Sequence, residues 1–92
     1  MAGDVLACRD HILGRLTEAM DDRGPGLSWI ERERFVVATA ANEWTFSHGG
    51  GRTVTVADVE RLEVLAVGHV DYASKLALYV AEAALRGEER HG

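Results

Sequence analysis

The first amphipathic stretch of the chain runs from about residue 4 to residue 22. Its apolar residues recur at spacings of three, four and seven, and they are Val5, Leu6, Ile12, Leu13, Leu16 and Met20. This spacing places them on one stripe of a helix. Asp4 is a suitable N-cap, and Gly24–Gly26 with its central proline ends the helix, because proline cannot continue the hydrogen-bond ladder.

A second amphipathic stretch covers residues 28–47. Ser28 and Glu31 have the spacing of a capping box, in which each side chain satisfies a free backbone amide at the helix start. The apolar face is formed by Ile30, Val37, Ala41 and Trp44, flanked by Trp29, Val36 and Ala40. Phe35 falls on the opposite side. Three glycines, residues 49–51, break the chain after this helix.

The third stretch carries the longest apolar pattern. Steps of three and four residues relate Val59, Leu62, Ala66, His69, Ala73, Leu76, Val80 and Ala83. Thr55 and Asp58 form a cap signal at its start, and no proline interrupts it. We therefore expect one helix over about residues 56–86, roughly 45 Å long at 1.5 Å per residue, with a kink at Gly68. We expect the tail, residues 87–92, to be disordered.

Two sides of this expected long helix are apolar. The helix-packing seam comprises Leu62, His69, Tyr72, Leu76, Tyr79 and Val80, while Val64, Leu78 and Leu85 lie on the opposite arc. Together with Phe35, that arc predicts an interface, because burying each large apolar side chain is worth about 1.5–3 kcal/mol. Self-association is one interpretation. Incidental exposure is the other, since single exposed leucines are ordinary on protein surfaces.

Length and composition favour a single folded domain over residues 1–92. The chain is 47% hydrophobic and 27% charged with one proline, which is typical of a globular protein. We expect an all-α, three-helix domain with a long C-terminal helix, a helical hairpin or bundle completed by oligomerisation. At 92 residues the core is small, so the stability margin is thin.

The charge balance argues against nucleic acid and anionic membranes as partners. Fifteen acidic and ten basic residues give a formal charge of −5. Four arginines, Arg9, Arg15, Arg32 and Arg34, could line one face of a DNA-binding helix-turn-helix protein. However, Glu31 and Glu33 alternate with two of them and neutralise that face locally.

Cysteine usage and the first residues bear on location. Cys8 is the single cysteine, so we expect a small buried apolar residue in a reducing compartment. The N-terminus lacks the pattern of a signal peptide, and no long uncharged apolar run is present. We expect a cytoplasmic protein, or a virion component if it is phage-encoded. One lysine among abundant Ala, Val, Arg and Gly suggests an actinobacterium or its phage.

Chemical motifs are scarce, so we expect no enzyme activity, no cofactor and no metal. No nucleophile elbow, phosphate loop, cysteine pair or His-Glu-x-x-His motif occurs. His69 is interpreted as a structural residue. An intersubunit metal site built from His69 with Glu60, Glu63 and Asp71 stays as an alternative, although these four residues lack the Glu-x-x-His spacing of di-iron helices.

These observations predict a small self-associating helical interaction or assembly module without catalytic activity. Its expected partners are further copies of the chain, as a dimer or a larger oligomer, or another protein. A phage structural or accessory role is one setting. A DNA-binding regulator of helix-turn-helix type is the alternative, followed by the intersubunit metal site.

Overall fold

Four helices make up the described part of the chain. The computed structural model describes residues 2–21, 29–49 and 52–86. The helices are α1 (Ala2–Asp21), α2 (Trp29–His48), α3 (Val56–Ala66) and α4 (Tyr72–Arg86), and no strand occurs among the described residues. The expected all-α class is confirmed, with four helices in place of three.

The first two helices agree with their predicted ranges to within two residues. Gly49, with φ +72°, takes the left-handed conformation directly after α2, which is the usual role of a glycine that ends a helix. Ser28 and the expected disordered tail, residues 87–92, lie outside the described residues. None of the described helices is long and apolar enough to cross a membrane.

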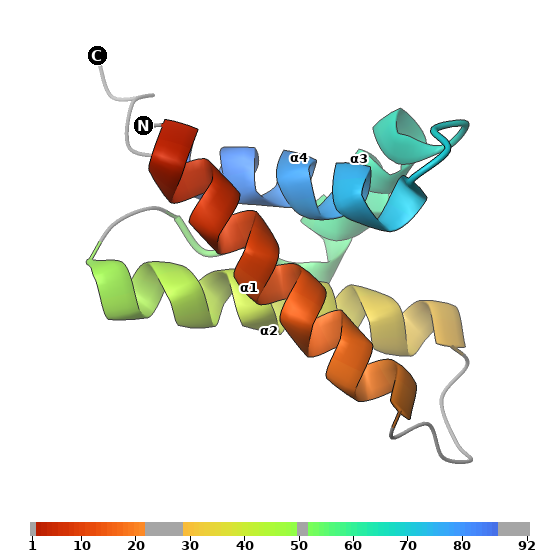
Figure 1. The fold of residues 1–92 in the computed structure, drawn as a ribbon, viewed down its shortest axis with the longest axis horizontal. Coiled ribbons are helices and arrows are strands. Elements are labelled where there is room, and N and C mark those ends of the chain that lie inside the picture. Colours follow the sequence, from red (N-terminus) through yellow and green to blue (C-terminus); the bar gives the residue numbers. More distant parts are fainter. Residues whose placement is uncertain (1, 22–28, 50–51, 87–92) are drawn as a thin grey trace.

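Helix α4 is the centre of the fold. Both α4 and α2 contact all three other helices, whereas α1 and α3 do not contact each other. Figure 1 shows α2 and α4 one above the other, α1 crossing in front of both, and α3 behind. Side chains that are completely buried include Cys8, Ile12, Val37, Val59, Leu76 and Val80. Every residue from 72 to 85 is consequently buried or half-buried.

The prediction of a single long helix over residues 56–86 is wrong, because the structure has two helices there. Helical geometry ends at Val67, whose φ of −60° and ψ of 135° are extended, and Gly68 follows with φ +97°. A left-handed residue is inexpensive only for glycine, so the expected kink site is where the chain turns. Turning there lets α3 pack on α4, so that Val59 and Ala66 of α3 are buried in the same core as Leu76.

Hydrogen bonds fix the connection between α2 and α3. The Asn42 side chain donates to the Val54 carbonyl oxygen (2.9 Å) and accepts from the Val54 amide (2.8 Å). The Arg52 amide donates to the Ala84 carbonyl oxygen at 2.8 Å. Each bond satisfies a backbone group that the connection would otherwise leave unpaired. Residues 52–55 are thus attached to both α2 and α4.

A capping box starts α3, as the sequence predicts. The Thr55 hydroxyl accepts from the Asp58 amide, and the Asp58 carboxylate accepts from the Thr55 amide at 3.0 Å. Arg52 and Arg61 both pair with the same buried carboxylate. A carboxylate in the first turn also interacts favourably with the helix dipole. Asp58 therefore joins the connection to the start of α3.

Cys8 is completely buried in the core, as expected for a small apolar residue. Burial raises the pKa of its thiol to about 11. Because the thiolate is the reactive form, we expect a neutral aromatic disulfide reagent to label Cys8 only after the chain unfolds. The time course of labelling, in buffer and in denaturant, measures this. Rapid labelling of the native protein would contradict the burial.

Candidate interaction surface

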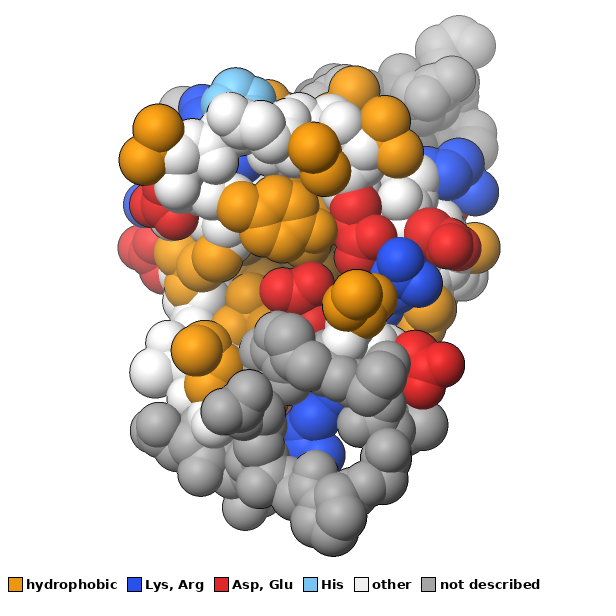
Figure 2. Space-filling view, turned by 90° about the vertical axis from the view of Figure 1, so that its right-hand side faces the viewer, with side chains coloured by type: hydrophobic (Ala, Val, Ile, Leu, Met, Phe, Trp, Pro, Cys, Tyr) orange, Lys and Arg blue, Asp and Glu red, His pale blue; other side chains and the backbone are white. Residues whose placement is uncertain are grey.

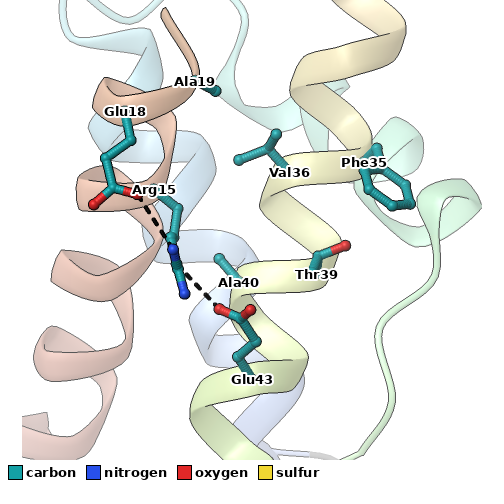
Figure 3. A pocket seen from close by; sticks show the side chains of 8 residues that line it. All are labelled: Arg15, Glu18, Ala19, Phe35, Val36, Thr39, Ala40 and Glu43. Carbon is teal, nitrogen blue, oxygen red and sulfur yellow. Dashed lines mark hydrogen bonds and ion pairs between the residues drawn. The ribbon is translucent and has the colours of Figure 1, made fainter. Parts of the chain in front are cut away.

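A groove lies between α1 and α2. It has a volume of about 260 Å³, and its lining residues are Arg15, Glu18, Ala19, Phe35, Val36, Thr39, Ala40 and Glu43. Figure 3 shows Arg15 reaching from α1 toward Glu43 on α2, with Val36 and Ala40 on the side of α2 that faces α1 and Phe35 on its far side. Typical ligand pockets begin at roughly 300 Å³, so this groove is small.

The charges in this groove are already paired. The Arg15 guanidinium donates to Glu18 and to Glu43, both at 3.2 Å, and His11 lies 3.1 Å from the same Glu43 oxygen. Hydrogen bonding to Glu18 and the charge of Glu43 raise the pKa of Arg15. With its donors directed to two carboxylates, Arg15 connects α1 to α2 and is poorly placed to bind an anion.

The corner between α3 and α4 exposes apolar side chains instead. We define the corner as residues 64–70, which contain no Asp, Glu, Lys or Arg. Its exposed large apolar residues are Val64 (73%), Leu65 (59%), Val67 (69%) and Val70, which is fully exposed. Contiguous exposed apolar patches of several hundred Å² are uncommon on monomers and often mark interaction sites. The corner is therefore the strongest candidate interaction surface among the described residues.

The four residues of the predicted interface separate into two groups. Phe35 is 61% exposed on the outer side of α2, and Val64 is exposed at the corner. Leu78 and Leu85 are half-buried on α4, and Leu85 packs against the core. The turn at Gly68 explains why these two leucines are half-buried, because it packs α4 against the other three helices. An interface role for Phe35 and Val64 stays a prediction.

The residues of the predicted packing seam are divided between α3, the corner and α4. Leu76 and Val80 are completely buried, while Leu62, Tyr72 and Tyr79 are partly buried and pack against the core. His69 does not lie on a helix. It is exposed in the corner, with its ring edge-on to Tyr79 at a centroid distance of 6.4 Å, so its placement on a continuous seam is wrong.

A charged cluster adjoins the corner on the side of α2. Arg34 donates two hydrogen bonds to Glu63, at 3.0 and 2.9 Å, and lies 3.6 Å from Glu60. The Glu63 side chain is only 13% exposed. Two parallel bonds between a guanidinium and a carboxylate are a strong pairing. This pair connects α2 to α3 and is the main electrostatic contact between them.

Glu33 lies beside this pair and is half-buried. Burial and the nearby Glu63 charge raise its pKa, with Arg34 acting in the opposite direction. Burial and the charges of Glu63 and Glu33 also raise the pKa of Tyr72, at the start of α4. Burial and the like charge of Glu63 thus both disfavour ionisation of the Glu33 carboxyl group. Its negative charge is therefore incompletely compensated.

Replacing Glu33 with glutamine is expected to stabilise the fold at neutral pH. The pKa of Glu33 is higher in the folded protein than its ordinary value of 4.5. Ionised Glu33 therefore lowers the free energy of unfolding at pH values above the folded pKa, and this loss disappears at pH values below 4.5. The gain in the free energy of unfolding should thus be present at pH 7 and vanish near pH 4. Thermal unfolding at both pH values measures it, and an equal gain at both would contradict the assignment.

The residues of the alternative metal site do not come together within one chain. Glu63 is held by Arg34, His69 faces Tyr79, and Asp71 accepts a hydrogen bond from the Ser74 amide. Within residues 2–21, 29–49 and 52–86, no group of three or more His, Cys, Asp or Glu side chains is arranged to hold a metal ion.

Sequence reasoning missed two features of this surface. Leu65 and Val70 are not among the residues predicted for the interface, because a continuous helix would place them on the two flanks of the packing seam. The seven-residue run without charge around Gly68 was the available signal. The Arg34–Glu63 pair was also missed, since the two residues are 29 positions apart and meet only through tertiary packing.

No family model, curated protein or solved structure matches this chain.

Proposed function

We propose that this chain is a small helical interaction module that self-associates through the corner and has no catalytic activity of its own. The observation that carries the proposal is the exposure of Val64, Leu65, Val67 and Val70 within seven consecutive uncharged residues. A protein of charge −5 repels its own copies over most of its surface. The corner itself carries no Asp, Glu, Lys or Arg, so burying it between two copies buries no like charges of the corner.

The energetics support an interface of modest strength. Each valine or leucine contributes about 1.5–3 kcal/mol when it is fully buried. A stable interface covers roughly 800 Å² on each partner, and four side chains provide only part of this. Apolar groups outside the corner must therefore contribute, and Phe35 of α2 is a candidate because it is 61% exposed.

An assembly role is the setting that we propose for such a module. The composition, which is rich in Ala, Val, Arg and Gly and has one lysine, supports a structural or accessory protein of an actinobacterial phage. The chain would then act in the cytoplasm or within a virion. A different protein, rather than a second copy, could also cover the exposed apolar side chains of the corner.

The helix-turn-helix alternative finds less support. A recognition helix needs a free polar face for the major groove, whereas residues 72–85 of α4 are all buried or half-buried. Arg15 and Arg34, two of the four arginines considered for DNA contacts, are directed to Glu43 and Glu63. A mobility shift with duplex DNA that disappears steeply with salt would reverse this preference.

The test is the oligomeric state of the protein and of two charge-introducing variants. We expect light scattering to show a dimer or larger species at high micromolar concentration. Val70→Glu should weaken association by about tenfold or more, because a carboxylate would be buried in the interface. Phe46→Glu is the matched control, since Phe46 is 91% exposed at the end of α2 that lies far from the corner.

Circular dichroism must show that both variants keep their helices. A wild-type protein that stays monomeric at high concentration would overturn the proposal. Equal weakening by Phe46→Glu and Val70→Glu would also overturn it, because the effect would then be one of net charge and not of the corner.

A further inference from the structure

The corner contains one titratable side chain, that of His69. His69 is exposed, and its ring meets Tyr79 edge-on at a centroid distance of 6.4 Å. Figure 2 looks onto the side of the molecule that carries the α3–α4 connection and shows a histidine side chain and several hydrophobic side chains in its upper part. Histidine changes its charge between about pH 5 and pH 8. The uncharged surface that we propose for self-association can therefore acquire a positive charge in mild acid.

The two carboxylates that flank the corner in the chain already have partners. Glu63, which precedes the corner, accepts two hydrogen bonds from Arg34. Asp71, which follows it, accepts from the Ser74 amide at 3.2 Å. A protonated His69 would have to compete with these partners for a carboxylate of its own chain.

Helix α4 supplies the other groups beside the His69 ring. Tyr79 faces the ring, and Lys75 and Glu82 lie one turn away from Tyr79 on the same side of α4. The charges of Lys75 and Glu82 are opposite, so together they favour neither form of the imidazole. Because His69 is exposed, its charged form is stabilised mainly by water, and association through the corner would remove this water.

We propose that protonation of His69 switches off self-association through the corner, so that the chain associates at neutral pH and separates in mild acid. This inference rests on the proposed self-association and names its regulation. A symmetric pair buries the same patch on both copies, so two His69 rings enter one interface. Burying a charge without a partner is costly, and two imidazolium groups at close range repel each other.

The overall charge of the chain predicts the opposite response to acid. The formal charge is −5 with the four histidines neutral. Protonating histidines brings this charge toward zero, which reduces the repulsion between copies. An effect of net charge would therefore strengthen association in acid, whereas the switch at His69 weakens it.

The test measures the dissociation constant by light scattering at about pH 7.5 and about pH 5.5, at equal ionic strength. We expect the wild type to associate about tenfold or more weakly at the lower pH, because a protonated copy must lose its proton before it associates. His69→Gln replaces the ring by a polar side chain that does not titrate. We expect this variant to associate at both pH values, without weakening in acid.

His48→Gln is the matched control for His69→Gln. His48 is also exposed, but it stacks on Trp44 at a centroid distance of 3.8 Å, at the end of α2 that lies far from the corner. We expect this variant to weaken in acid as much as the wild type does. Circular dichroism at both pH values separates a loss of association from a loss of helix.

Three results would overturn the inference. They are equal or stronger association of the wild type in acid, equal weakening of His69→Gln and wild type, and a loss of helix in the wild type at about pH 5.5. If the wild type associates at about pH 7.5, each of these results leaves the proposed self-association intact. A wild type that is monomeric at that pH contradicts self-association itself, so the two failures are distinguishable.

Discussion

Leu76→Ala is expected to lower the free energy of unfolding by about 2–5 kcal/mol, the range for a leucine truncated in a rigid core. Leu76 is completely buried on α4, the helix against which the other three pack. The loss combines the transfer energy of the missing atoms with the cost of the cavity that they leave. Small domains have a total stability near 5 kcal/mol, so the variant should be partly unfolded at physiological temperature.

Leu65→Ala is the matched control for this prediction. It removes the same atoms from a leucine that is 59% exposed at the corner. We expect its free energy of unfolding to change by no more than about 0.5 kcal/mol. Urea unfolding followed by circular dichroism measures both variants. Similar losses for the two leucines would contradict the burial pattern, and with it the turn that places α4 at the centre.

Asp58→Asn is expected to lower the free energy of unfolding by about 2–3 kcal/mol at neutral pH, combining a lost cap with lost charged hydrogen bonds. The Asp58 carboxylate accepts from the Thr55 amide and pairs with Arg52 and Arg61. The hydrogen bond from the Thr55 backbone is the main cause that lowers the pKa of Asp58, and the two arginines add to it, although burial opposes them.

The pH dependence follows from this lowered pKa. A carboxylate whose pKa is lower in the folded state than in the unfolded state contributes its full stabilisation at pH values above its ordinary pKa of 3.8. That contribution is lost as the pH falls through the folded pKa. The difference between wild type and Asp58→Asn in thermal unfolding should consequently be large at pH 7 and should shrink in strong acid.

Asp71→Asn serves as the control for Asp58. Asp71 also lies at the start of a helix, where its carboxylate accepts from the Ser74 amide at 3.2 Å, but it is exposed. Its loss should cost no more than about 1 kcal/mol. If both variants lost the same stability, Asp58 would be an ordinary cap, and its two arginine partners would contribute nothing.

Local patterns predict much of the fold and little of the surface. The ranges of α1 and α2, the cap formed by Thr55 and Asp58, and the burial of Cys8 follow from spacing and side-chain chemistry. The predicted apolar faces are only partly buried, because Leu6, Met20 and Ile30 are 45%, 59% and 56% exposed. The outward position of Phe35 follows from helical periodicity in the same way. The exposure of the corner does not follow from local patterns, because it depends on the direction that α4 takes after the turn at Gly68.

By itself, the sequence determined an all-helical chain, because apolar spacing, caps and glycine breaks act over one or two turns. Only the tertiary structure decided that residues 56–86 form two helices. One rod would leave apolar groups on both sides in water, whereas a turn through Gly68, with φ +97°, buries Val59 and Leu76 in one core. The Arg34–Glu63 pair and the exposed corner are consequences of that turn.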